Sequence, residues 1–152
     1  MFYSKSFGYA LRGVLYIALI CKDNQRIQVD EIARELNVPK HFLSKILKKI
    51  VKNGILNSTK GPYGGFSINE KTVSTFLYDL FVIINGETHF DNCVLGLKKC
   101  NSDHPCPLHD KMQHSREEVY LLFTRTTIGN LLEKEQTDLI RGISLKEIKD
   151  KN

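Results

Sequence analysis

Residues 27–54 contain the feature that most restricts the fold: two short stretches with helical periodicity, divided by a tight turn. The apolar positions of the first stretch share one helix face, and they are Val29, Ile32, Ala33 and Leu36. Those of the second stretch also share a face, and they are Phe42, Leu43, Ile46, Leu47 and Ile50. Asn37 and Val38 suit the turn, Pro39 suits a first helical position, and Asn53-Gly54 suits a left-handed stop. The pattern predicts two helices that pack together.

The opposite face of the second predicted helix is basic. Its polar residues are Lys40, His41, Ser44, Lys45, Lys48, Lys49 and Lys52. A run of lysines is usually a solvated helix face. After a short helix and a tight turn, however, it is typical of a recognition helix in the DNA major groove. We expect Lys40, His41, Ser44 and Lys45 at base edges, because these positions are N-terminal, and the three later lysines at phosphates.

A β-hairpin is predicted directly after this helix. Residues 55–68 have two strand-forming stretches around the turn sequence KGPYGG. In this position the hairpin suits the wing of a winged helix, and we expect Lys60 and Tyr63 to reach the minor groove or the backbone. The glycines at the tip, which permit positive φ and a close approach to DNA, are Gly61, Gly64 and Gly65.

Three further segments have helical periodicity: residues 7–20, 72–86, and a long one from 107 to about 133. The predicted buried side of 72–86 comprises Val73, Phe76, Leu77, Leu80, Phe81 and Ile84. The stripe of the long helix comprises Val119, Leu122, Phe123, Thr126 and Ile128. One small domain covers such a helix poorly, so the stripe predicts a second subunit. The alternative is that the stripe folds back on the chain's own core.

These elements predict a mainly α protein with a small β-hairpin wing. Residues 1–86 form a winged helix-turn-helix DNA-binding domain, 87–109 a cysteine-rich loop, 107–134 a dimerisation helix and 135–152 a C-terminal tail. The charge distribution agrees, because residues 1–70 have 11 Lys+Arg against 5 Asp+Glu, whereas residues 71–152 have 11 against 12.

The N-terminus has no secretory pattern, and the apolar stretch 9–20 is interrupted by Arg12 and is too short to cross a bilayer. We therefore expect a soluble, cytoplasmic protein. In a reducing cytosol, clustered cysteines are metal ligands or redox sensors more often than disulfides. Cys21, at the end of the first predicted helix, suits a small core residue instead. No nucleophile–base pair or phosphate loop indicates an enzyme.

Residues 93–109 concentrate the cysteine chemistry. Cys93, Cys100 and Cys106 are separated by six and five residues, and His109 follows three positions after the last. Three thiolates and an imidazole suit zinc or an iron-sulfur cluster. Structural zinc sites usually have cysteines about two to four residues apart, and this spacing is absent here, so a cluster is favoured. A zinc site or a thiol switch without a cluster is the alternative.

The segments YALRGVLYIA, VDEIARELNVPKHFLSKILKKIVKNGIL and KGPYGGF resemble the Rrf-type winged helix-turn-helix transcription regulators, in particular their iron-sulfur branch (IscR-, NsrR- and RirA-like). The resemblance implies a homodimer, a palindromic double-stranded DNA operator, and a cluster on three cysteines that regulates transcription, with repression favoured. It also implies base reading by His41 and Ser44 and a basic wing residue at Lys60.

The resemblance also bears on the fourth ligand. His109 matches the C-x-x-H arrangement of IscR-like members and implies a [2Fe-2S] cluster. NsrR-like members instead use an acidic residue near the partner's N-terminus for a [4Fe-4S] cluster, and Gly8 stands near that position here. The first cysteine spacing is six residues where the family has five, which leaves His104 as a substitute for His109.

Overall fold

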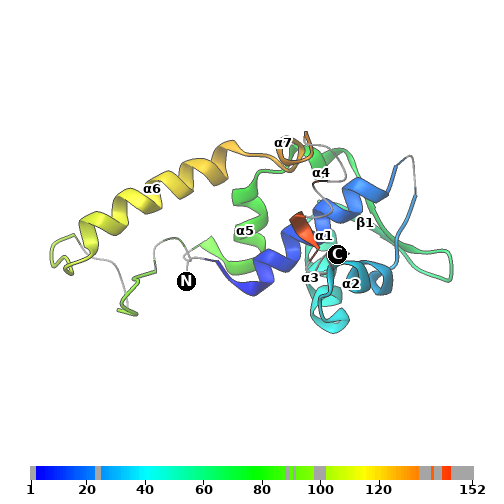
Figure 1. Cartoon of the computed structure of the whole chain (residues 1–152), viewed down its shortest axis with the longest axis horizontal. Helices are drawn as coiled ribbons and strands as arrows, with labels where there is room; N and C mark the ends of the chain where they lie inside the picture. The colour runs from blue at the N-terminus through cyan, green and yellow to red at the C-terminus, as the bar shows by residue number, and fades with distance from the viewer. Residues whose placement is uncertain are drawn as a thin grey trace, which may run out of the picture.

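The computed structural model describes residues 3–22, 25–87, 90, 92–97, 102–133, 138 and 142–144. Figure 1 shows a bundle of helices with a hairpin at one end and a long helix that extends away at the other. The elements are α1 (Lys5–Ile20), α2 (Val29–Leu36), α3 (Lys40–Lys52), β1 (Leu56–Thr59), β2 (Gly65–Ile68), α4 (Glu70–Ser74), α5 (Leu77–Asn85), α6 (His109–Arg125) and α7 (Ile128–Leu131). Within these described ranges, every helix is too short or too polar to cross a bilayer.

Helix α1 forms the centre of the core. Ser4 caps it by accepting a hydrogen bond from the amide of Phe7 at 3.1 Å. The helix packs against α2, α3, α5 and β2, and its inner residues Val14 and Ile17 are fully buried. A Cβ atom at Gly13 would lie 3.3 Å from side-chain atoms of α3, so glycine allows α1 and α3 to approach closely.

The helix-turn-helix forms as predicted, with small shifts at its ends. Asn37 adopts φ 51°, in the left-handed region, and the amide of buried Val38 donates to the carbonyl of Ala33 at 3.0 Å. Pro39 is the N-cap of α3 and not its first helical residue. Gly54, with φ 78°, supplies the left-handed stop after the helix.

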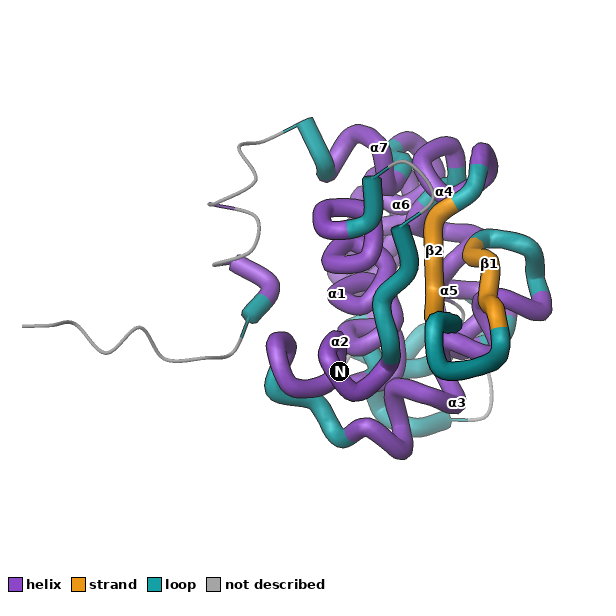
Figure 2. The backbone as a smooth tube through the Cα atoms, turned by 90° about the vertical axis from the view of Figure 1, so that its right-hand side faces the viewer, coloured by secondary structure: helices purple, strands orange, loops and turns teal. Residues whose placement is uncertain are grey.

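The predicted wing is also present. Strands β1 and β2 pair antiparallel, from Leu56 opposite Ile68 to Thr59 opposite Gly65. Figure 2 shows the segment before α2 alongside β2, where Ile27 pairs with Phe66 through two backbone hydrogen bonds of 3.0 and 2.8 Å. This additional pairing joins the wing to the helix-turn-helix and was not predicted from the sequence.

The prediction of a single helix over residues 72–86 is wrong. The chain forms α4 and α5 instead, with extended backbone at Thr75 and Phe76. The physical reason is a crossing segment: the amide of Leu77 donates to the carbonyl of Thr126, and the amide of Ile128 donates to that of Thr75, both at 2.9 Å. These bonds replace helical ones. As a result Val73 and Phe76, which were predicted to be buried, are 43% and 41% exposed.

The long helix ends earlier than predicted. Helix α6 begins at His109 and stops at Arg125, because Thr126 and Thr127 pair with the chain near Phe76 before α7 begins. Phe123, near the end of α6, is 5% exposed and contacts an aromatic cluster that includes Phe7 and Phe81. The cluster anchors the C-terminal end of α6 to α1 and α5.

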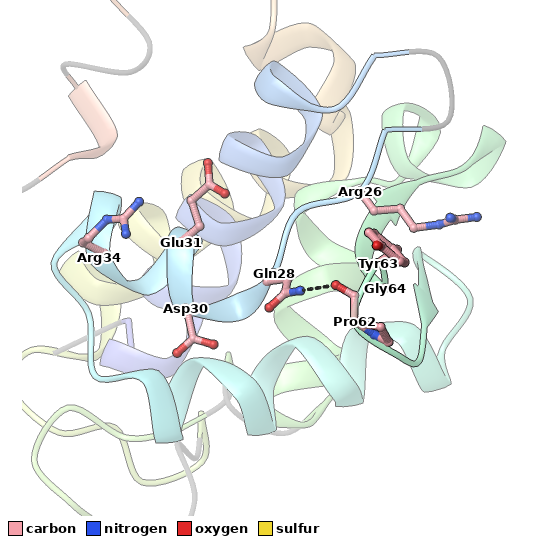
Figure 3. A pocket seen from close by; sticks show the side chains of 8 residues that line it. All are labelled: Arg26, Gln28, Asp30, Glu31, Arg34, Pro62, Tyr63 and Gly64. Atoms are coloured by element: carbon pink, nitrogen blue, oxygen red, sulfur yellow. Dashed lines mark hydrogen bonds between the residues drawn. The ribbon is translucent and has the colours of Figure 1, made fainter.

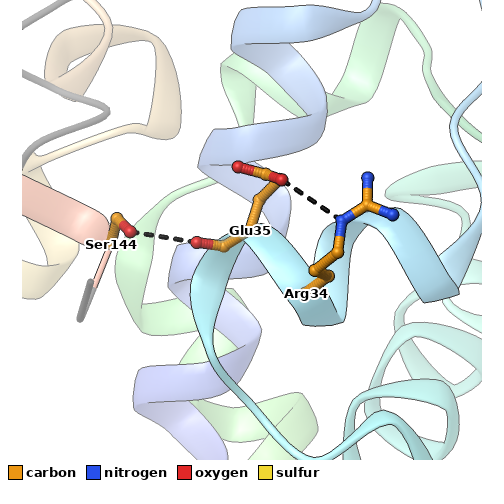
Figure 4. Close-up of polar contacts among 3 residues, drawn as sticks. All are labelled: Arg34, Glu35 and Ser144. Carbon is orange, nitrogen blue, oxygen red and sulfur yellow. Dashed lines mark hydrogen bonds and ion pairs between the residues drawn. The ribbon is translucent and has the colours of Figure 1, made fainter.

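The predicted tail is described only at residues 138 and 142–144. Ser144 donates its hydroxyl to the carbonyl of Glu35 at 2.9 Å, at the end of α2 (Figure 4). Arg12 donates to the carbonyls of Leu36 and Ile143. The contacts to Glu35 and Leu36 satisfy carbonyl groups that the last turn of a helix leaves without intrahelical partners. The contacts of Ile143 and Ser144 hold the described part of the tail against α1 and α2.

Candidate nucleic-acid interface and cysteine segment

Helix α3 presents one apolar and one basic face. Its buried residues are Leu43, Ile46, Leu47 and Ile50. Successive residues of an α-helix are rotated by about 100°, which places four exposed residues at the centre of the opposite face. These are His41, Lys45, Lys48 and Lys52. The fold therefore brings four of the seven predicted DNA-contacting residues of this helix into one solvent-facing row.

Two other predicted residues lie at the edge of this row. Lys40 forms an ion pair with Asp30 in the first turn of α2, with 2.6 Å between Nζ and Oδ1. Both side chains are more than half exposed, so the pair contributes little to stability. The pair does neutralise one charge at the start of α3. Ser44 is half-buried on the same edge.

Lys49 lies on the other edge and points toward α5. Its Nζ atom donates to the carbonyl of Ile84 at 3.4 Å. This carbonyl belongs to the last turn of α5, where a positive charge is favourable. Phe42 lies on the same edge of α3 and is 58% exposed, so the prediction that it packs against α2 is wrong. Its ring contacts His41, with 6.0 Å between ring centroids.

The tip of the wing exposes both residues predicted there. Lys60 is exposed, and Tyr63 is 91% exposed, the largest fraction among the large hydrophobic side chains described. The predicted role of the glycines needs correction. A Cβ atom at Gly64 would lie 2.1 Å from the carbonyl oxygen of Thr59, and one at Gly65 would lie 2.5 Å from that of Ile27. These two glycines accommodate the chain's own backbone, whereas Gly61, with φ 103°, has open space around it.

A pocket of about 450 Å³ opens between the wing tip and the N-terminal end of α2 (Figure 3). Its lining is polar and consists of Arg26, Gln28, Asp30, Glu31, Arg34, Pro62, Tyr63 and Gly64. The side-chain amide of Gln28 donates to the carbonyl of Pro62 at 3.1 Å. The sequence did not indicate that Arg26 and Gln28 lie beside the wing tip. Their position depends on the pairing of Ile27 with Phe66, which is 39 positions away in the chain.

The predicted metal ligands are only partly described. Cys93 and Cys106 are half-buried free thiols, whereas Cys100 lies outside the described residues. His109 begins α6 and is 9% exposed, and its amide donates to the carbonyl of Cys106 at 2.9 Å. His104, the substitute ligand, is exposed. Among the residues that the structure describes, no three histidine, cysteine or acidic side chains are grouped closely enough to hold a metal ion.

Cys21 differs from the other described cysteines. It is 2% exposed in the core, and its thiol donates to the carbonyl of Phe66 at 3.8 Å. Burial raises the pKa of this thiol, and the nearby charge of Glu31 raises it further. The prediction that Cys21 is a core residue is therefore confirmed, and its thiol is a poor nucleophile.

Comparison with known proteins shows the family to which this chain belongs. A sequence model of the Rrf2 family, described as iron-dependent transcriptional regulators, matches residues 3–134. The chain belongs to the Rrf2 family. It is 30% identical over 141 residues to an Aquifex aeolicus protein assigned to the HTH-type transcriptional regulators, a match that covers 91% of this chain and 96% of that relative. The family resemblance inferred from the sequence is confirmed.

Solved structures have the same fold as this Rrf2 protein. CymR (YrzC), the global cysteine regulator of B. subtilis, superposes with a TM-score of 0.67 at 19% identity, covering 86% of this chain and 95% of CymR. IscR of T. potens gives a TM-score of 0.64 at 15% identity, covering 86% and 85%. The mainly α winged-helix prediction is confirmed. Rrf2 proteins are DNA-binding transcription regulators and not enzymes, so the protein is a transcription regulator.

Proposed function

We propose that this Rrf2 regulator binds a palindromic operator as a homodimer, represses transcription there, and senses redox state, nitric oxide or iron through an iron-sulfur cluster on Cys93, Cys100, Cys106 and His109. The observation that carries the sensing role is the position of His109. It is buried in the first turn of α6, and its backbone is bonded to Cys106. The cysteine segment and the predicted dimerisation helix are therefore joined at one point.

The DNA-reading part of the proposal assigns different roles to the residues of α3. His41, with Ser44, Lys40 and Lys45, is placed at the N-terminal half of the helix, where side chains reach base edges. Lys48 and Lys52 follow on the same exposed face and suit phosphates. Lys49 contributes less, because it points toward α5. Lys60 and Tyr63 of the wing contact the flanking groove.

The homodimer is supported by the uncovered part of α6. This helix extends from the bundle (Figure 1), and three consecutive apolar residues near its C-terminal end remain accessible. Tyr120, Leu121 and Leu122 are 45%, 42% and 56% exposed. Tyr120 also contacts Tyr78 and Phe90 of its own chain, so the uncovered apolar surface is that of Leu121 and Leu122. Exposed leucines on a projecting helix are typical of a subunit contact. Dimerisation would place two α3 helices at half-sites about one DNA turn apart.

The donor types of the cysteine segment fit the proposed cofactor. Thiolates bind iron-sulfur clusters, and an imidazole can replace a thiolate on one iron. The described donors are not grouped into a metal site, and Cys100 lies outside the described residues, so the ligand set rests on donor chemistry and on the family's description as iron-dependent. The [2Fe-2S] type is favoured and [4Fe-4S] is the alternative. When bound, a cluster supplies a centre that responds to oxidants, nitric oxide and iron supply.

The protein's own residues would couple cluster ligation to the arrangement of the two subunits. Arg116 of α6 donates to the carbonyl of Asn92 at 2.6 Å, which ties the residue before Cys93 to the same helix that starts at His109. Ligation at Cys93, Cys106 and His109 would order this segment and the first turn of α6. Because α6 carries the proposed subunit contact, the spacing of the two α3 helices would change with it.

The test is to purify the protein without oxygen and to measure its absorption spectrum together with iron, sulfide and zinc content. We expect a brown protein with iron and sulfide in matching amounts. Cys106→Ser should remove the colour, and His109→Ala should shift the absorption spectrum. Cys21→Ser, which changes a core residue outside the proposed site, should have the colour and the spectrum of the wild type. Operator affinity, on DNA selected from random sequence, should differ between the loaded and the stripped protein.

A thiol switch on the same cysteines is the second candidate function. It is favoured by the half-burial of Cys93 and Cys106 as free thiols and by the fold shared with CymR, a global cysteine regulator. This alternative predicts a colourless protein, even after anaerobic reconstitution with iron and sulfide. DNA affinity would then change on treatment with a thiol oxidant, and Cys93→Ser would abolish that change. Such a result would refute the cluster and leave DNA binding in place.

A further inference from the structure

The strands of the wing are anchored, because they pack against α1 and α3 with Leu56 and Phe66 buried in the core, but the tip of the wing extends beyond these contacts. The tip is the turn of a two-stranded hairpin, and a hairpin turn without further contacts is only marginally stable in water. At its tip, Lys60, Pro62 and Tyr63 are exposed. The tip therefore needs contacts from another element if it is to present Lys60 and Tyr63 to DNA at a fixed place.

The residues just before α2 supply those contacts. Ile27 pairs with Phe66 through two backbone hydrogen bonds, which hold β2 near its first residue. Gly65 allows this pairing, because a Cβ atom there would lie 2.5 Å from the carbonyl oxygen of Ile27. The backbone pairing fixes the start of β2 but does not reach the tip.

Gln28 reaches the tip itself. It is the N-cap residue of α2, and its side chain makes no capping hydrogen bond to that helix. Instead its Nε2 atom donates to the carbonyl of Pro62 at 3.1 Å, across the pocket in Figure 3. The tip turn is closed by the amide of Gly64, which donates to the carbonyl of Gly61 at 3.0 Å. One side chain thus connects the turn of the wing to the first helix of the helix-turn-helix.

We infer that Gln28 is a positioning residue for DNA recognition: it holds the wing tip at a fixed place relative to α2 and α3, so that Lys60 meets its phosphate. This inference rests on the proposed role of the wing as a DNA contact. Gln28 itself need not touch DNA. Its loss would leave Lys60 charged but free to move with the tip, and the contact between Lys60 and DNA would be populated less often.

The test compares Gln28→Met, Lys60→Met and the double variant with the wild type. Operator affinity is measured at several salt concentrations, because each lysine–phosphate contact adds about 0.9 to the slope of log K against log salt. Lys60→Met should lower the slope by about that amount per protomer. Gln28→Met removes no charge, yet it should lower the slope in the same direction. It should weaken binding by at most about fivefold per protomer, because one net hydrogen bond limits how strongly the binding-competent position of the tip is favoured. In the double variant, Gln28→Met should add little to the effect of Lys60→Met.

Gln25→Met is the matched control. Gln25 is exposed three positions earlier and accepts a hydrogen bond from the amide of Lys22 at 3.4 Å. This variant should bind as the wild type does. If Gln28→Met also binds as the wild type while Lys60→Met lowers the slope, the positioning role is refuted and the wing remains a DNA contact. If Lys60→Met leaves the slope unchanged, the proposed role of the wing is refuted instead.

Hydrogen exchange measures how firmly the wing tip is held in the absence of DNA. Exchange at the Gly64 amide, which closes the tip turn, should become faster in Gln28→Met and remain unchanged in Gln25→Met. Unchanged exchange in Gln28→Met would overturn the inference whatever the DNA assays give. A common unfolding midpoint for the wild type and all four variants would exclude general destabilisation as the cause.

Discussion

Lys48 and Lys49 are adjacent in the sequence, but the fold turns them in different directions. Lys48 is at the centre of the exposed face of α3, directly opposite the buried residues. Lys49 lies at the edge of that face and donates to the carbonyl of Ile84 in α5. Replacing each by Met removes the same charge from the same helix and retains the unbranched stem and a good helix propensity. We predict that only Lys48→Met removes a phosphate contact.

The size of the effect follows from counterion release. One phosphate contact contributes about 0.9 to the salt slope, so a homodimer that loses one contact per protomer should lose about 1.8. Between about 0.05 M and 0.2 M salt, a fourfold change, the affinity of the wild type should therefore fall about twelvefold more than that of Lys48→Met. Lys49→Met should retain the slope of the wild type, with a small uniform loss from its lower net charge.

The assay is fluorescence anisotropy of a labelled operator at five or more salt concentrations, with both variants measured in parallel. Because the two variants have the same net charge, their general attraction to DNA is matched, and the comparison isolates the local contact. Equal slopes for the two variants would contradict the orientation of α3 described above. So would a lower slope for Lys49→Met than for Lys48→Met.

Three further predictions concern stability and assembly. Gly64→Ala should destabilise the protein by about 1–3 kcal/mol, because the added Cβ atom would clash with the carbonyl of Thr59. Gly8→Ala should stabilise it by about 0.5–1 kcal/mol, because Gly8 lies within α1 with open space around it. Urea unfolding measures both changes. Leu122→Glu should shift the protein from dimer to monomer in sedimentation velocity, and an unchanged dimer would exclude this side chain from the interface. The free energy of unfolding should fall as pH rises above about 8.5. Burial raises the pKa of Cys21, so the folded protein keeps a thiol proton that the unfolded chain releases. Cys21→Ala should reduce this dependence of the free energy of unfolding on pH.

The local elements could be predicted from the sequence because their signals are local. The apolar periodicity of residues 29–50 predicted α2 and α3, and Asn37 and Gly54 adopt the positive φ angles that end these helices. The KGPYGG turn predicted the wing in the same way. In each case the residues that determine the structure lie within a few positions of it, so one sequence window contains the whole signal.

The errors arose where distant segments meet. Residues 72–86 have an adequate helical pattern, but backbone bonds from Thr126 and Ile128 extend the chain at Thr75 and Phe76. The contact between Gln28 and Pro62 and the contact between Ser144 and Glu35 likewise join positions 34 and 109 residues apart. No periodicity encodes such pairs, because each depends on how the core brings two elements together. Sequence reasoning therefore identified the basic face and the wing tip but missed Gln28.

Helix α6 shows why the sequence left two explanations open for its apolar stripe. The helix has 17 residues and is therefore about 26 Å long, and the core buries only two of them, His109 and Phe123. Phe123 is buried among the aromatic rings of α1 and α5, so this part of the stripe folds back on the chain's own core. Leu121 and Leu122 directly precede Phe123 in the helix, and they are 42% and 56% exposed. The two explanations apply to different sides of one helix, and a proposed partner subunit would therefore cover Leu121 and Leu122 while Phe123 stays in the core.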